Sequence, residues 1–100
     1  MEFYYAVYQK GHELTVAACD EDTLGKIFSC SEKGIEIDVK KAFYAKNKGQ
    51  IEEILPHLRE ATILNLVGKE IIKMALEEGL ITNECVLVIG DTLHAQRAKM

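Results

Sequence analysis

The chain has 100 residues, of which 48% are hydrophobic and 28% are charged, and its formal net charge at pH 7 is −4. This length and composition predict one globular domain over residues 1–100, and the acidic balance argues against a nucleic-acid binder driven by overall charge. The longest uncharged apolar-rich stretch, ATILNLVG, is far shorter than the ~20 residues that span a bilayer, so no membrane partner is expected.

The remaining composition predicts a cytoplasmic protein without a bound metal or cofactor. The amino terminus MEFYYAVYQK has no basic region followed by an apolar one, so we expect no secretory signal. The three cysteines are odd in number and widely spaced, which does not predict disulfides. No Cys and His residues have the spacing of a zinc finger, and no glycine-rich phosphate-binding motif is complete.

The first forty residues are predicted to form mainly strands. EFYYAVYQ at 2–9 and ELTVAAC at 13–19 are rich in aromatic and β-branched residues, and Gly11 lies in the turn of the hairpin that they would form. Short strands are predicted at 27–30 and 35–39. Between the second and third strands, Asp20 is expected to cap a helix of about two turns that ends at Gly25.

The second half is predicted to contain a short helix at 51–58, broken near Pro56, and one long helix at 59–78. In that long helix the apolar residues would cover one broad side, which is typical of a helix packed on a sheet. CVLVIG at 85–90 predicts a strand buried on both faces, and residues 91–100 close the chain. The predicted fold class is α/β, of the α+β type, with a small mixed sheet of four or five strands, one long packed helix and one or two short helices.

CDEDTLGK at 19–26 is the first candidate site. A cysteine beside a helix N-terminus can be a nucleophile, but three neighbouring carboxylates disfavour its thiolate. Asp20 and Asp22 could bind a metal, although the calcium-loop spacing is incomplete. Capping by Asp20 explains the stretch without a ligand, so Cys19 and Asp20 remain catalytic candidates beside a structural interpretation.

IGDTLHAQ at 89–96 is the second candidate site. His94 follows a predicted strand, its ordinary pKa lies near neutral pH, and Asp91 could orient it as a general acid or base. Gln96 is a further binding candidate, and so is Asn65, a poor helix former in the middle of the long predicted helix. The structural alternatives are that His94 and Gln96 form hydrogen bonds to backbone groups and that Asn65 serves the packing of the protein.

KKAFYAKNK at 40–48 is the only stretch that resembles a nucleic-acid site. Lysines bind phosphates, and unpaired bases stack on aromatic rings. The candidates are Lys40, Lys41, Tyr44, Lys46 and Lys48. The alternative is a lysine-rich surface turn held by its aromatic residues, with Phe43 buried and Tyr44 facing out.

The motifs CDEDTLGK, FYAK, ATILNLVGKEII, EEGLI, VLVIG and HAQ together resemble the archaeal family of unknown function DUF424, from about residue 4 to residue 97. The resemblance implies a small stand-alone α/β protein and no assigned reaction. It marks Cys19, Asp20, Asn65, Gly68 and the segment 94–96 as motif positions. A proline would be expected directly before His94, and this chain departs from that pattern with Leu93.

Three functions follow as hypotheses. The first is a non-catalytic module that binds RNA or a ribonucleoprotein through residues 40–48. The second is a small enzyme or small-molecule sensor in which Asp20, Asn65 and His94 converge on one polar pocket. The third is a homo-oligomeric subunit whose wide apolar helix face forms the interface.

Overall fold

A computed structural model describes residues 1–98 of the chain. Its eight strands are β1 (Glu2–Lys10), β2 (Glu13–Asp20), β3 (Ile27–Cys30), β4 (Ile35–Asp38), β5 (Asn47–Gln50), β6 (Ile63–Val67), β7 (Val86–Ile89) and β8 (Thr92–Ala98). Its three α-helices are α1 (Lys41–Tyr44), α2 (Ile51–Glu60) and α3 (Lys69–Glu77), and its short 3₁₀ turns are η1 (Glu21–Thr23) and η2 (Asn83–Cys85).

Six strands form one mixed sheet in the order β5-β1-β2-β6-β8-β7, while β3 and β4 form a separate two-stranded hairpin. The pairing of β2 with β6 is parallel and the other pairings are antiparallel. The α+β class is therefore confirmed, with six strands in the main sheet rather than four or five. The strands of the main sheet that were not predicted are β5, β6 and β8, whereas the predicted strands β3 and β4 pair only with each other.

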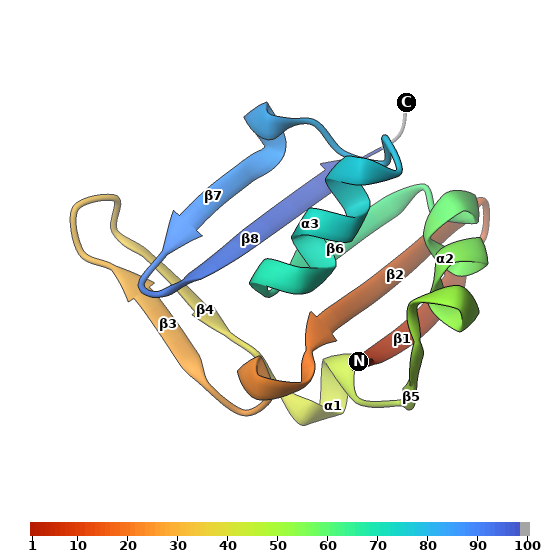
Figure 1. Ribbon diagram of the computed structural model, residues 1–100, viewed down its shortest axis with the longest axis horizontal. Helices are drawn as coiled ribbons and strands as arrows, with labels where there is room; N and C mark the ends of the chain where they lie inside the picture. The colour runs from red at the N-terminus through yellow and green to blue at the C-terminus, as the bar shows by residue number, and fades with distance from the viewer. Residues whose placement is uncertain (99–100) are drawn as a thin grey trace.

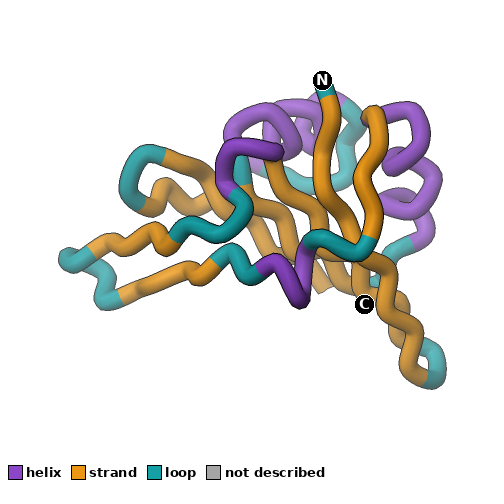
Figure 2. Tube along the Cα trace, turned by 90° about the horizontal axis from the view of Figure 1, so that it is seen from below, coloured by secondary structure: helices purple, strands orange, loops and turns teal. Residues whose placement is uncertain are grey.

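The two faces of the main sheet are covered by different elements. Helices α2 and α3 lie on one face (Figure 1), and Ile54, Leu58, Ile71 and Ile72 are fully buried there. Figure 2 shows the β3–β4 hairpin and α1 on the other side of the sheet. A second, smaller core on that side includes Phe28, Val39 and Tyr44 together with Cys19 and Val67 of the sheet. The sheet is thus the middle layer of the molecule.

The predicted long helix at 59–78 is wrong. Helix α2 continues through Pro56 to Glu60, residues 63–67 form the central strand β6, and α3 begins at Lys69. A strand buried on both faces has apolar side chains in every direction, so in the sequence it resembles one side of a buried helix. Gly68 separates strand from helix with a φ of 127°, a conformation that other residues rarely adopt. The wide helix face on which the homo-oligomer was predicted therefore does not exist.

Two further predictions are corrected. Strand β7 lies at the edge of the sheet, and Val88 is 59% exposed, so the run at 85–90 is not buried on both faces. The helix of two turns after Asp20 is only the three-residue turn η1, and the Asp20 side chain makes no capping bond to it. By contrast, the hairpin of β1 and β2 and the strands β3 and β4 form where the sequence predicts them. Within residues 1–98 no helix combines the length and the apolar character needed to cross a membrane.

Gly68 provides a test of this architecture. A Cβ atom at Gly68 would lie 2.3 Å from Cγ of Asp20, and the residue has a positive φ. We expect Gly68→Ala to lower the free energy of unfolding by about 3 kcal/mol, measured by urea denaturation. The control is Gly79→Ala, where φ is 70° and no atom lies within 4 Å of the added Cβ. It should cost only about 1 kcal/mol, and equal losses in both variants would contradict the close packing of Asp20 on Gly68.

Candidate functional site

Asn65 and His94 meet on the sheet face that carries the β3–β4 hairpin. Asn65 of β6 is paired with Gln96 of β8, and Val67 is paired with His94. Directly paired residues point to the same face, and so do residues two apart on one strand, so these four side chains share a face. The Nε2 atom of His94 lies 3.3 Å from Oδ1 of Asn65.

Tyr44 of α1 completes a polar group with these two residues. Its hydroxyl donates to Oδ1 of Asn65 at 2.7 Å, and burial raises the pKa of Tyr44, which keeps the phenol protonated as a donor. Because Oδ1 of Asn65 can only accept, its contact with His94 requires the proton on Nε2 of the imidazole. Nδ1 of a neutral His94 is then an acceptor, and no group within residues 1–98 occupies the Nδ2 donors of Asn65.

This polar group forms one wall of a shallow pocket of about 360 Å³, here called the Asn65–His94 pocket. Its lining includes Lys40, Phe43, Tyr44, Asn65, His94 and Gln96. Glu36 and Asp38 of β4 lie at the same pocket, so its charge is mixed. Burial lowers the pKa of His94, so the imidazole is neutral at pH 7. The pocket therefore offers neutral donors and acceptors from the sheet and charged groups from β4 and α1.

Asp20 does not join this group, so the predicted convergence of three residues is wrong. Its two carboxylate oxygens accept hydrogen bonds from the backbone N–H groups of Glu70 and Ile71, each at 2.9 Å. Asp20 therefore caps α3, on the face of the sheet opposite to Asn65 and His94. Burial raises the pKa of Asp20, while these two hydrogen bonds lower it. The sequence predicts a capping role correctly for Asp20 but assigns it to the wrong helix.

Cys19 has the environment of a core residue. Its side chain is fully buried, and burial raises its pKa to about 11, because the low-polarity surroundings disfavour the thiolate. Its nearest charges, Asp20 and Asp22, raise the pKa further. This arrangement does not support Cys19 as a nucleophile.

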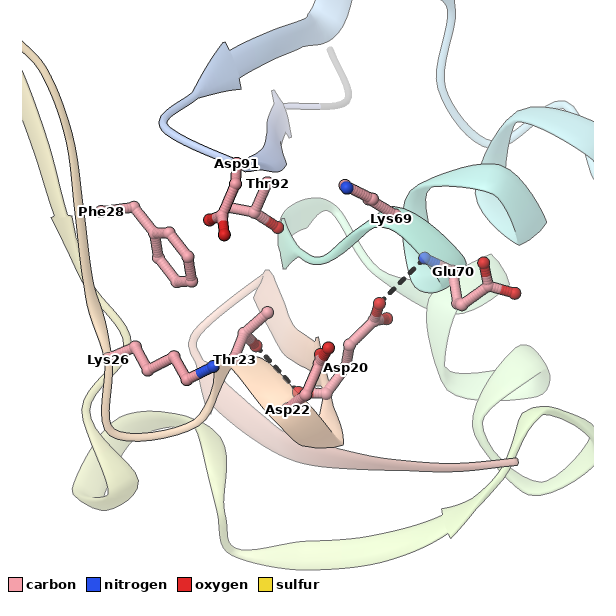
Figure 3. A pocket seen from close by; sticks show the side chains of 9 residues that line it. All are labelled: Asp20, Asp22, Thr23, Lys26, Phe28, Lys69, Glu70, Asp91 and Thr92. Carbon is pink, nitrogen blue, oxygen red and sulfur yellow. Dashed lines mark hydrogen bonds between the residues drawn. The ribbon is translucent and has the colours of Figure 1, made fainter.

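Asp91 lines a different hollow from His94, so it does not orient the imidazole. This hollow of about 230 Å³ lies at the carboxyl ends of β2 and β6 and is called here the strand-end cavity (Figure 3). Its lining includes Asp22, Lys26, Phe28, Lys69, Asp91 and Thr92. Of these, Lys26, Lys69 and Thr92 escape prediction because isolated lysines and threonines carry no sequence signal. Within residues 1–98 no group of three or more His, Cys, Asp or Glu residues is arranged to hold a metal ion.

The lysines of residues 40–48 differ in their availability. Lys40, Lys41 and Lys46 are exposed and make no ion pair within residues 1–98. Lys48 lies 2.9 Å from Glu21 and 3.7 Å from Glu2, and its ammonium is 5.2 Å from the centre of the Tyr4 ring. The predicted roles of the aromatic residues are reversed, since Tyr44 is buried while Phe43 is half-buried and stacks on Tyr8. Tyr44 therefore cannot stack on a base.

Comparison with known proteins gives the family and the fold. The family model described as a protein of unknown function, DUF424, matches residues 8–100, and the chain belongs to this family. The crystal structure of an uncharacterized conserved protein from Methanopyrus kandleri is similar with a TM-score of 0.79. The two chains are 20% identical, and the match covers 100% of this chain and 95% of the other. A search of curated proteins finds no match.

Asp20 is expected to be the most important carboxylate for stability. Asp20→Ala removes both acceptors of the α3 N-terminus and leaves the buried N–H of Ile71 without a partner, which should lower the free energy of unfolding by about 3 kcal/mol. The exposed Asp22 is the matched control, and Asp22→Ala should change stability by less than about 0.5 kcal/mol. Urea denaturation at pH 7 measures both, and similar values for the two variants would contradict the cap.

The titration of His94 is expected to be displaced to low pH. Because burial lowers its pKa below the ordinary 6.5, the unfolded chain binds the proton more tightly than the folded chain. The contribution of His94 to stability is therefore complete above pH 6.5 and is lost as the pH falls through its folded-state pKa. Imidazole NMR signals should give a midpoint below that of free histidine, and His94→Gln should remove the matching part of the acid destabilisation. A midpoint at or above 6.5 would show that the side chain is solvated.

Proposed function

We propose that this member of the DUF424 family is a non-catalytic module that binds unpaired RNA, with a base in the Asn65–His94 pocket and phosphates on Lys40, Lys41 and Lys46. The observation that carries the proposal is that Lys40 lines the same pocket as Asn65 and His94. The polar group of the sheet and one lysine without an acidic partner thus line one pocket, and Lys41 and Lys46 follow Lys40 in the same segment of the chain.

The chemistry of the pocket suits the edge of a base. Asn65 offers its Nδ2 donors, neutral His94 offers an acceptor at Nδ1, and the exposed Gln96 amide offers both. Unpaired bases present donors and acceptors side by side on their edges, and proteins recognise them with such side chains. Phe43 at the rim provides an aromatic surface on which a base can rest.

Phosphates require cations, and α1 with its flanking residues supplies them. Lys40, Lys41 and Lys46 are exposed and unpaired within the described part of the chain, so binding a phosphate would break no existing ion pair. Glu36 and Asp38 lie close to the pocket and oppose a long phosphate track. We therefore propose a short site of one or two nucleotides rather than an extended groove.

The arrangement of titratable groups favours binding over catalysis. His94 contacts the amide of Asn65 rather than a carboxylate, and Asp20 and Asp91 lie at the strand-end cavity. A general base of the usual kind is oriented by a third group that stabilises its charged form, and burial here favours the neutral form instead. A small-molecule sensor remains the second candidate, because the Tyr44–Asn65–His94 group would suit a free heterocycle equally well.

Charge reversal tests the RNA proposal. In Lys40→Glu/Lys41→Glu/Lys46→Glu we expect at least tenfold weaker binding of a labelled unpaired RNA oligomer, measured by fluorescence anisotropy. The slope of log K against log salt should flatten by about 0.7 to 1.4, since each of the one or two single-strand phosphate contacts contributes about 0.7. The control Lys10→Glu/Lys33→Glu/Lys73→Glu reverses three exposed lysines elsewhere and should leave the slope unchanged.

The variant Asn65→Ala tests recognition of the base separately from the attraction between lysines and phosphates. It should weaken binding several-fold without changing the salt slope, because it removes no cation. Equal losses in the two lysine triples would indicate nonspecific attraction. If the variant with Lys40, Lys41 and Lys46 reversed binds the RNA oligomer as tightly as the unchanged protein, the RNA site is rejected. Binding of free bases or nucleosides with no preference for the oligomer would favour the small-molecule sensor.

A further inference from the structure

The strand-end cavity is lined by a hydroxyl group without a protein partner. Thr92 is the first residue of β8 and only 5% exposed, and its side chain is directed into the cavity (Figure 3). Within residues 1–98 its hydroxyl makes no hydrogen bond, and its oxygen remains accessible from the open cavity. The hydroxyl of Thr92 is therefore free to bond to water or to a ligand there.

The charges of the cavity are of both signs and are not paired with one another. Lys26 enters from the loop before β3 and Lys69 from the start of α3, while Asp22 and Asp91 come from η1 and the β7–β8 turn. None of the four makes an ion pair within the described residues. Glu70 of α3 also lines the cavity, so two ammonium groups face one hollow together with the carboxylates of Asp22, Glu70 and Asp91, besides Asp20, which caps α3.

The N-terminus of α3 does not add an anion site. Asp20 already accepts from the N–H groups of Glu70 and Ile71, so its own charge and the positive end of the helix offset each other. An anion would have to bind through Lys26 and Lys69, close to the carboxylates of Asp22, Glu70 and Asp91. A simple cation would lie close to the two lysines. A small molecule carrying both charges can place each of them beside groups of the opposite sign.

We propose that the strand-end cavity binds a small zwitterion of the α-amino acid class, separately from any RNA bound at the Asn65–His94 pocket. The ligand carboxylate lies between Lys26 and Lys69 and accepts from the hydroxyl of Thr92, and its ammonium group lies at Asp22 and Asp91. The ring of Phe28 forms an apolar wall for the remainder of the ligand. At about 230 Å³ the cavity is smaller than the ~300–1,000 Å³ pockets of drug-sized ligands, which limits the ligand to a few heavy atoms.

The position of the strand-end cavity in the fold supports its proposed role as a ligand site. The cavity lies outside the carboxyl ends of the parallel pair β2 and β6, beside the first turn of the helix that follows β6. Ligands of α/β sheets collect at this end of parallel strands, where loops carry side chains over the edge of the sheet. Here η1, the β7–β8 turn and the start of α3 supply those side chains.

The test compares L-alanine with ethylamine, which lacks the carboxylate, and with propionate, which lacks the ammonium. Binding is measured from the NMR shifts of the backbone amides of the isotope-labelled full chain. Glycine and L-leucine are tested as further ligands to find the size of side chain that the cavity accepts. We expect saturable shifts at Lys69 and Thr92 with at least one of the amino acids and at least tenfold weaker binding of both one-charge analogues. Equal binding of ethylamine or of propionate would replace the proposal with a site for one charge. No saturable shift with any amino acid at millimolar concentration would overturn it.

Single substitutions test which side chains of the cavity contact the ligand. Thr92→Val keeps the shape but removes the hydroxyl, and it should weaken binding about tenfold, whereas Thr92→Ser should restore most of it. Lys69→Met and Asp91→Asn should each weaken binding similarly, while Lys73→Met, an exposed lysine of the same helix, should not. Unfolding curves confirm that each variant is folded, and unchanged binding in folded Thr92→Val and Lys69→Met would overturn the site. The lysine triple at 40–46 should bind the amino acid normally, so this proposal and the RNA proposal fail independently.

Discussion

The contact between Asp20 and the start of α3 connects the main parts of this fold. Asp20 is the last residue of β2, and its carboxylate accepts from the N–H groups of Glu70 and Ile71, which lie 50 and 51 residues later at the start of α3. A helix N-terminus has unsatisfied donors, and a carboxylate placed there both pairs them and balances the helix dipole. Because β6 pairs with β2 and leads directly into α3, this bond fixes the helix over the same edge where the parallel strands end. Gly68 is required at that point, since any side chain would collide with Asp20.

Strand alternation explains why neighbouring motif residues have different surroundings. Cys19 and Asp20 are adjacent in sequence, yet the first faces the hairpin side of the sheet and the second faces α3. In β6, Asn65 and Val67 face the hairpin side while Leu64 and Leu66 enter the core under the helices. The motifs CDEDTLGK and ATILNLVG therefore each contribute to both sides of the sheet. In ATILNLVG the polar Asn65 faces the hairpin side, whereas in CDEDTLGK the polar Asp20 faces α3 and Cys19 lies in the smaller core. Treating either motif as a single chemical site would therefore combine residues that lie on opposite faces of the sheet.

The sequence predicts local structure well where its pattern has one interpretation and poorly where two patterns coincide. The hairpin of β1 and β2 follows from aromatic and β-branched runs around a glycine turn. In ATILNLVG, a central strand buried on both faces has the same continuous apolar character as a buried helix, and only the conformation of Gly68 separates them. For the site, Asn65 and His94 stand out as polar residues in unusual places, and the structure brings them together. The bond of Tyr44 to Asn65 and the position of Thr92 at the strand-end cavity could not be found in this way, because they depend on segments far apart in the chain.

Strand β8 shows how the two hollows are related. Thr92, His94 and Gln96 alternate along it and therefore point to the same side of the sheet. The first lines the strand-end cavity and the other two line the Asn65–His94 pocket. A strand is a stiff connection, and its three polar side chains keep a fixed spacing. The hairpin β3–β4 also reaches both hollows, through Phe28 at one and Ile37 at the other. Strand β8 and the hairpin therefore each contribute side chains to both hollows.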